Sequence, residues 1–120
     1  MISREFAAQF ATDWIAAWNS RDLAKVLAHY ADDFEMSSPY IARIAGDPRG
    51  MLMGQAHVGV YWAKALNRMP ELHFELIEVL AGVDSVVICY RGISGSAAEV
   101  FFFDKLGTVI KAFAHYAQDI

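Results

Sequence analysis

One carboxylate lies inside an aromatic run near the end of the chain, where the segment Ala97–Phe103 has the sequence AAEVFFF. Side chains alternate across a β-strand, so Glu99 shares one face with Phe101, and the opposite face is also apolar. A carboxyl group among apolar side chains resists ionisation, so its pKa rises and it can hold or transfer a proton near neutral pH. We therefore take Glu99 as the first candidate for a general acid, or for a base that acts through a water molecule. The alternatives are a glutamate that points to solvent and a buried carboxyl group that hydrogen-bonds to Trp14 or Tyr30 for structural reasons.

His115 is the other candidate base, because an imidazole titrates near neutral pH. The alternation of the predicted last strand, residues 109–117, divides its side chains between a face with Ile110, Ala112, Ala114 and Tyr116 and a face with Val109, Phe113 and His115. If Tyr116 lines a pocket, His115 points to the outer, convex face of the sheet, although a β-bulge in the strand would reverse this. Exposed phenylalanine side chains are typical of a subunit interface. We expect a homodimer formed through Phe102, Phe113 and His115.

No arrangement of residues in the sequence indicates a metal or cofactor site. His29, His57 and His73 are scattered along the chain without the spacing of metal ligands. Ser38 has no His–Asp support, so we expect its hydroxyl to donate or accept hydrogen bonds and not to act as a nucleophile. We therefore expect neither a metal ion nor a cofactor.

Three segments have apolar residues at helical spacing. Their inward-facing side chains are Phe6, Phe10, Trp14 and Trp18 in the first, Leu23, Val26, Leu27 and Tyr30 in the second, and Val58, Tyr61, Trp62, Ala65, Leu66 and Met69 in the third. Ser3 is expected to cap the first helix, and Pro70 to end the third, which begins at Gln55. Residues 41–54 contain several glycines without periodicity, which predicts a long loop.

The strands follow a period of two. Phe34, Met36 and Ser38 share one face of a short strand that Pro39 closes. A further strand begins at Glu71, and its alternation slips by one residue, which predicts a β-bulge. Strands over 86–91, 97–103 and 109–117 follow. Helices first and strands last predict an α+β fold: a curved, mostly antiparallel sheet wrapped around three N-terminal helices, forming a cone-shaped pocket for a small apolar molecule.

Composition excludes several classes of protein. A chain of 120 residues forms one domain, residues 1–120, and 56% hydrophobic residues place it among globular proteins. The net charge of -4 and the absence of clustered Lys and Arg argue against nucleic acid. No apolar stretch reaches membrane-spanning length, so we expect no membrane association. The N-terminus does not resemble a signal peptide, and the single Cys89 fits a reducing compartment, so we expect a cytoplasmic protein.

The order of elements, together with the segments 14–23 (WIAAWNSRDL), 30–33 (YADD) and 54–56 (GQA), resembles the nuclear transport factor 2-like superfamily. Within it, the chain is similar to the SnoaL-like and ketosteroid-isomerase-like branch over nearly its whole length. The resemblance implies a cone-shaped α+β barrel of the cystatin-like type. It implies no single activity, because the superfamily contains isomerases, dehydratases, epoxide hydrolases, polyketide cyclases and proteins with no known reaction.

The resemblance to ketosteroid isomerase can be followed residue by residue. The protonated aspartate of that enzyme corresponds to Glu99, its oxyanion-hole tyrosine to Trp14, and its general-base aspartate to Ser38, which is not a base. A supporting tyrosine of some members corresponds to Tyr30, and pocket aromatics correspond to Trp62 and Tyr116. Only one of the three key groups is therefore an acid, which argues against the steroid-isomerase mechanism. The Asp–Arg–Asp pattern of limonene-epoxide hydrolase is not matched either.

These observations lead to one prediction and one alternative. We expect a small, cofactor-independent isomerase, dehydratase, cyclase or hydrolase whose catalytic residues are Glu99, Tyr30 and Ser38. The substrate, a small apolar molecule, is expected to contact Trp14, Phe34, Met36, Trp62, Phe101 and Tyr116. The alternative is a non-catalytic ligand-binding or dimerisation module with the same fold.

Overall fold

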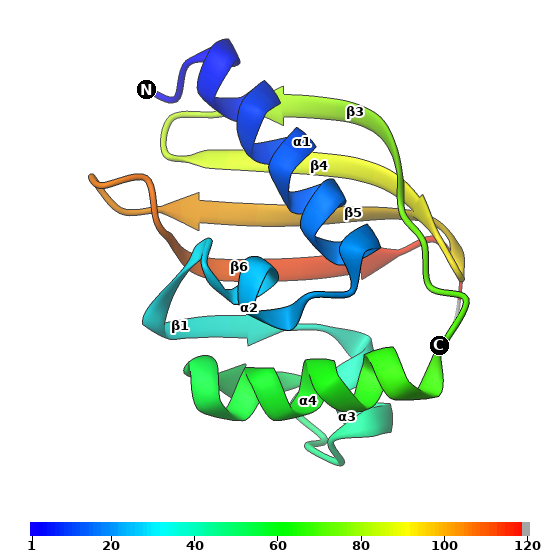
Figure 1. The fold of residues 1–120 in the computed structure, drawn as a ribbon. Helices are drawn as coiled ribbons and strands as arrows, with labels where there is room; N and C mark the ends of the chain where they lie inside the picture. The colour runs from blue at the N-terminus through cyan, green and yellow to red at the C-terminus, as the bar shows by residue number, and fades with distance from the viewer. Residues whose placement is uncertain (119–120) are drawn as a thin grey trace.

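A computed structural model describes residues 1–118, which form four helices and six strands. The helices are α1 (Arg4–Ser20), α2 (Leu23–Leu27), α3 (Pro39–Ile44) and α4 (Gln55–Arg68). The strands are β1 (Tyr30–Ser37), β2 (Met51–Met53), β3 (Glu75–Ala81), β4 (Ser85–Gly92), β5 (Gly95–Phe103) and β6 (Val109–Tyr116). They form one sheet in the order β2-β1-β6-β5-β4-β3, in which β1 and β6 are parallel and all other neighbours are antiparallel. The predicted α+β class with a curved, mostly antiparallel sheet is confirmed (Figure 1).

Helix α1 crosses the inner face of the sheet in front of β3, β4 and β5 (Figure 1). The side chain of Ser3 accepts a hydrogen bond from the Phe6 backbone N–H at 3.0 Å, which caps the helix as predicted. The helix ends at Ser20, and the left-handed backbone of the following residue, Arg21 (φ 61°), lets its N–H bond to the Trp18 carbonyl. Of the predicted apolar stripe of α1, Phe10, Trp14 and Trp18 are buried, and Phe10 packs edge-to-face on Phe101 and Phe103. The prediction is wrong for Phe6, which is exposed near the start of the helix.

Helix α4 packs beside β1 and β2 and closes the other end of the core (Figure 1). Its buried side chains include Val58, Tyr61, Trp62, Ala65 and Leu66, as the helical spacing predicts. The Trp62 ring contacts Trp18 of α1 and Tyr30 of β1, with ring centroids 5.2 Å apart in both pairs. The two long helices therefore share one aromatic core with the sheet.

The segment predicted to be a loop contains two elements that sequence periodicity does not show. Ser38 caps helix α3, which begins at Pro39, so the predicted strand ends at Ser37. Strand β2 pairs with the end of β1. The predicted second helix is also shorter than expected: it ends at Leu27, and Tyr30 begins strand β1 instead of continuing the helix. The helices in the described part of the chain are therefore four and not three.

Register shifts interrupt the strand pairing at three places in the described residues, and the first lies between Tyr30 and Glu35, where β1 pairs with β6. The register between β3 and β4 shifts between Leu76 and Glu78, which confirms the predicted bulge, although β3 begins at Glu75 and not at Glu71. The third irregularity lies at the start of β6, where Phe102 pairs with Lys111 and Phe103 pairs with Val109. This bulge buries Val109 and exposes Ile110, so the predicted faces of these two residues are reversed.

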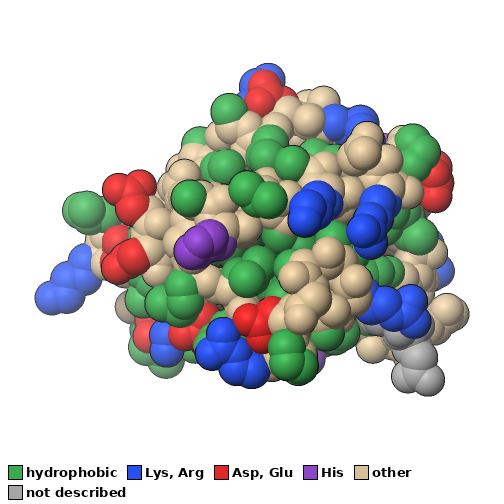
Figure 2. Space-filling view, turned by 90° about the horizontal axis from the view of Figure 1, so that it is seen from below, with side chains coloured by type: hydrophobic (Ala, Val, Ile, Leu, Met, Phe, Trp, Pro, Cys, Tyr) green, Lys and Arg blue, Asp and Glu red, His purple; other side chains and the backbone are tan. Residues whose placement is uncertain are grey.

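Charged side chains of both signs are dispersed over the face of the molecule drawn in Figure 2. Figure 2 shows one face, on which Lys, Arg, Asp and Glu side chains are separated by hydrophobic and polar groups. Among the described residues, no helix is both long enough and apolar enough to cross a membrane.

Candidate functional site

A pocket lies between the inner face of the sheet, helix α4 and the C-terminal half of α1. It contains about 620 Å³ of empty space, including the part that opens to solvent. Its walls are formed by Trp14, Trp18, Met36, Tyr40, Tyr61, Trp62, Ala65, Met69, Leu72, Phe74, Tyr90, Gly92, Ile93, Ser94, Gly95, Ala97, Glu99 and Tyr116. Ile93, in the turn between β4 and β5, is exposed and marks the solvent side. The wall is mainly apolar and rich in aromatic side chains, with a small number of polar groups.

Glu99 lines this pocket and is only 4% exposed. The Tyr90 hydroxyl donates a hydrogen bond to its Oε1 atom at 3.2 Å. Burial raises the pKa of Glu99 to about 8, although the Tyr90 hydrogen bond partly opposes the shift. Glu99 can therefore carry a proton at neutral pH and lose it at mildly alkaline pH, as the sequence predicts for a carboxyl group in this strand.

Three tyrosines from different elements lie around this carboxyl group: Tyr61 of α4, Tyr90 of β4 and Tyr116 of β6. Burial, together with the nearby Glu99 charge, raises the pKa of each phenol, so all three stay protonated across the physiological range. They are neutral hydroxyl groups that can donate to a ligand or to Glu99. Tyr40 of α3 lies next to Tyr116, edge-to-face at 4.8 Å, and hydrogen-bonds to Ser94 in the β4–β5 turn.

Five of the nine predicted site residues line the pocket: Glu99, Trp14, Met36, Trp62 and Tyr116. The other four, Tyr30, Ser38, Phe34 and Phe101, are buried in the core but do not line it. Contact of these four with a substrate stays a prediction, and of the four, Ser38 interacts through its hydroxyl with Tyr61 and Tyr116 of the pocket wall.

Tyr30 and Ser38 have structural partners that explain their burial. The Trp14 indole N–H donates to the Tyr30 hydroxyl at 2.9 Å. The Ser38 hydroxyl accepts from the Tyr40 backbone N–H at 3.2 Å at the start of α3. Neither residue hydrogen-bonds to Glu99 among the described contacts. The predicted pairing of Glu99 with Trp14 or Tyr30 is therefore replaced by a pairing with Tyr90.

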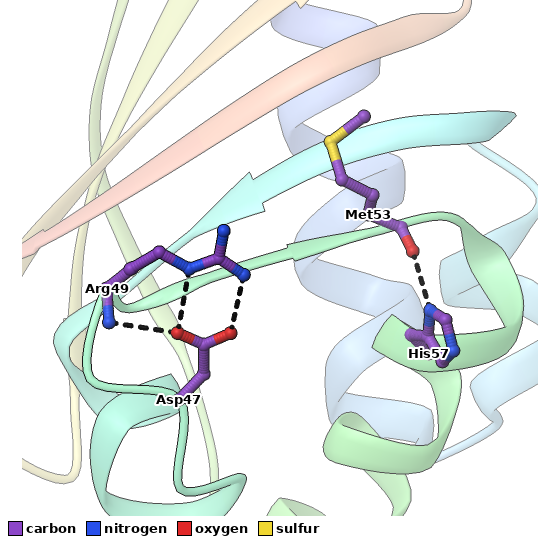
Figure 3. Close-up of polar contacts among 4 residues, drawn as sticks. All are labelled: Asp47, Arg49, Met53 and His57. Carbon is purple, nitrogen blue, oxygen red and sulfur yellow. Dashed lines mark hydrogen bonds and ion pairs between the residues drawn. The ribbon is translucent and has the colours of Figure 1, made fainter.

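The histidines lie outside the pocket. His115 is exposed on β6, and its Nδ1 lies 3.1 Å from the Phe113 carbonyl, so it points away from the pocket as expected. His57, in the first turn of α4, is exposed and lies 3.2 Å from the Met53 carbonyl (Figure 3). The same view shows the ion pair between Asp47 and Arg49 in the loop before β2, at 2.9 Å. Within residues 1–118, no group of three or more His, Cys, Asp and Glu is arranged to hold a metal ion.

Sequence reasoning missed Tyr40, Tyr61 and Tyr90 as parts of the site, since it placed Tyr61 only on the buried side of a helix. Tyr90 shares the inner face of β4 with Val86 and Ile88, and strand alternation could have placed it there. Its closeness to Glu99 depends on the register between β4 and β5, which pairs Tyr90 with Ala97, two residues before Glu99. Tyr40 could not be found, because α3 carries no periodic signal.

The family of the chain follows from its sequence and from its fold. The profile of the SnoaL-like domain matches residues 11–113, so the chain belongs to the SnoaL-like family. Among curated proteins, none matches at a significant level.

Solved structures share the fold along nearly the whole chain. A SnoaL-like protein of unknown function from Burkholderia thailandensis is 57% identical, with a TM-score of 0.93 and coverage of 98% of each chain. An NTF2-like protein of unknown function from Burkholderia pseudomallei is 18% identical, with a TM-score of 0.72, covering 96% of this chain and 92% of that chain. A proposed isomerase of the SnoaL-like family from Agrobacterium tumefaciens is also 18% identical, with a TM-score of 0.72, covering 95% of this chain and 99% of that chain. The last two, at this identity, show the fold alone.

Proposed function

We propose that the protein binds a small, largely apolar molecule in the pocket and catalyses a cofactor-independent proton transfer on it. The reaction is of the isomerase, dehydratase, cyclase or hydrolase type. The observation that supports this proposal most directly is that Glu99, the one carboxyl group among the described residues that line the pocket, is buried beside a tyrosine hydroxyl. A carboxyl group in such surroundings is suited to general acid–base catalysis near neutral pH.

The two protonation states of Glu99 would have different roles. The neutral acid donates a hydrogen bond or a proton to an oxygen of the substrate. The carboxylate accepts a proton from the substrate or from a water molecule. Tyr90 is the residue best placed to assist, because its hydroxyl donates to Glu99 Oε1 and stabilises the carboxylate.

A second polar group in the pocket wall favours a ligand that carries a hydrogen-bond acceptor, such as an oxygen atom. Trp18 lines the pocket, and its buried indole N–H has no hydrogen-bond partner among the described residues. A buried donor without a partner costs about 1–3 kcal/mol. An acceptor on the ligand would remove this cost if it reached Trp18.

The second candidate function is non-catalytic ligand binding. It is favoured by the composition of the pocket wall, which contains one carboxyl group and, among the described residues, no histidine or lysine to act as a partner base. Under this function, the hydroxyl groups and Glu99 fix the orientation of a ligand without transferring a proton.

The replacement Glu99→Gln separates the two functions, because it preserves shape and removes the proton that titrates. We expect turnover to be lost and ligand binding to be retained when wild type and variant are assayed on a panel of cyclic enones, epoxides and β-hydroxy ketones. Glu75→Gln, on the exposed side of β3, is the matched control and should behave as wild type. Turnover that is unchanged in Glu99→Gln would remove the proton-transfer proposal. Binding without turnover in wild type over the whole panel would support the non-catalytic alternative.

A further inference from the structure

The charge of the pocket wall is unbalanced. Among the residues within 1–118 that line the pocket, Glu99 is the only carboxyl group, and none is Lys, Arg or His. The charge that forms when Glu99 ionises therefore has no cationic partner in the wall. Buried charges in proteins are normally paired, so the partner of this one is best sought in the ligand.

One of the two carboxyl oxygens is available to such a partner. Oε1 accepts the hydrogen bond from Tyr90, whereas Oε2 has no hydrogen bond to any group in the described part of the chain. Glu99 lines the pocket, so a ligand there can reach the carboxyl group.

The aromatic residues of the pocket wall also suit a positively charged ligand. Trp14, Trp18 and Trp62 all line the pocket, together with four tyrosines and Phe74. The faces of aromatic rings have a negative electrostatic potential that attracts cations, and the attraction is strongest for tryptophan. Aromatic side chains also cover the apolar groups that surround an alkylated nitrogen.

We propose that the pocket binds an organic ammonium ion, with the positive nitrogen next to Oε2 of Glu99 and its apolar substituents against the tryptophan rings. This inference rests on the proposed ligand-binding role of the pocket and names the chemical class of the ligand. Ionised Glu99 supplies the counter-charge and the aromatic wall excludes water. An anionic ligand is disfavoured, because it meets a carboxylate and no cation.

Ammonium binding and proton binding then compete at Glu99. The other titratable groups that face it are Tyr30 from β1, Tyr61 from α4, Tyr90 from β4 and Tyr116 from β6. The pKa of each of these phenols is raised, so Glu99 alone among them titrates between about pH 6 and pH 9. The affinity for a permanent cation should therefore increase with pH by up to about tenfold per pH unit and level off near the pKa of Glu99. A neutral ligand that accepts a hydrogen bond from protonated Glu99 shows the opposite dependence.

The test uses benzyltrimethylammonium and its uncharged carbon counterpart, neopentylbenzene. Binding is followed by tryptophan fluorescence, since all three tryptophans line the pocket, and by calorimetry in buffers of different ionisation enthalpy. We expect wild type to bind the cation at least about tenfold more tightly than the neutral compound at about pH 8. We also expect proton release on binding below that pH. Glu99→Gln should lose this preference, whereas Glu75→Gln should keep it.

Equal affinity for the two compounds in wild type, or affinity for the cation that falls as pH rises, would overturn the inference. Both measurements are made on wild type, so they do not depend on the folding of a variant. Failure here is distinct from failure of the proposed reaction. Turnover of neutral substrates that requires Glu99, without cation preference, would reject only the ammonium ligand. Cation binding without turnover of any substrate would reject only the reaction.

Discussion

Glu99 and Tyr90 lie on neighbouring antiparallel strands, offset by two residues, and their side chains meet in the pocket. The local sequence predicted one of these two residues. A single acid in an aromatic strand is an unusual pattern, so Glu99 could be identified without a structure. Tyr90 is an ordinary strand tyrosine, and only the cross-strand register shows that it contacts the acid. A site residue can therefore be predicted from sequence when its residue type is rare in a protein core. A contact between two residues cannot be predicted when it depends on the pairing of distant strands.

The raised pKa of Glu99 has a consequence for stability. The unfolded chain loses this proton near pH 4.5, the ordinary pKa of a glutamate, whereas the folded protein keeps it until about pH 8. Between these values the folded state binds more protons, so the free energy of unfolding falls as pH rises. Relative to Glu99→Gln, wild type should lose about 1 kcal/mol of stability per pH unit within this window. Urea unfolding of both proteins at a series of pH values measures the difference. A free energy of unfolding that changes with pH in the same way in both proteins would contradict a buried Glu99 that titrates near pH 8.

Tyr30 offers a contrasting test at the same scale. Tyr30→Phe leaves the buried Trp14 indole N–H without its acceptor, which should destabilise the protein by about 1–3 kcal/mol. Ligand affinity should change little, because Tyr30 does not line the pocket. Tyr40→Phe is the counterpart, and it should weaken ligand binding because Tyr40 does line the pocket. Denaturant unfolding and fluorescence titration distinguish the two effects. A large loss of ligand affinity in Tyr30→Phe would restore its predicted role in the site.

Short elements are the part of the fold that periodicity could not predict. The long helices α1 and α4 were found from their apolar stripes, and the bulge in β3 from a slip in alternation. Helix α3 has six residues, fewer than two full turns, and so presents no repeating apolar face. The cap and the proline that start it, Ser38 and Pro39, instead resemble the end of a strand. Most of the element that carries Tyr40 to the pocket therefore lies in the segment predicted as a loop, residues 41–54.

The cap of α3 can be tested against an equivalent cap elsewhere. Ser38→Ala removes the acceptor of the Tyr40 backbone N–H and should cost about 1 kcal/mol of stability. It should also weaken ligand binding, because α3 positions Tyr40 in the pocket wall. Ser3→Ala removes the corresponding cap of α1 and should cost a similar amount without affecting the ligand. Identical effects of the two substitutions on ligand affinity would show that α3 does not shape the site.

At the scale of the whole molecule, the element order predicted the fold class, and the resemblance of segments 14–23, 30–33 and 54–56 to a known superfamily predicted the family; both are confirmed. The dimer remains a proposal. On the outer face of the sheet, the half-buried rings of Phe102 and Phe113 contact each other edge-to-face at 5.9 Å, next to exposed His115. A paired aromatic surface beside polar groups has the composition of a subunit interface.

The proposed homodimer can be disrupted without disturbing the pocket. Phe113→Glu places a charge on the outer face of β6, away from Glu99, and should convert a dimer into a monomer. Val60→Glu is the control, since Val60 is exposed on α4. Sedimentation equilibrium gives the mass of each variant. A wild-type protein that sediments as a monomer would exclude this interface, and a dimer that persists in Phe113→Glu would place the interface elsewhere.

The proposed proton transfer requires a carboxylic acid that remains protonated at neutral pH inside the pocket. Its most direct test is an NMR titration of the Glu99 side-chain carboxyl carbon, assigned by comparison with Glu99→Gln. A midpoint near the pKa of about 8 is the expected result. A midpoint near 4.5, the pKa of an ordinary glutamate, would show that the carboxyl group is ionised in contact with water and would contradict both the proposed proton transfer and its structural basis.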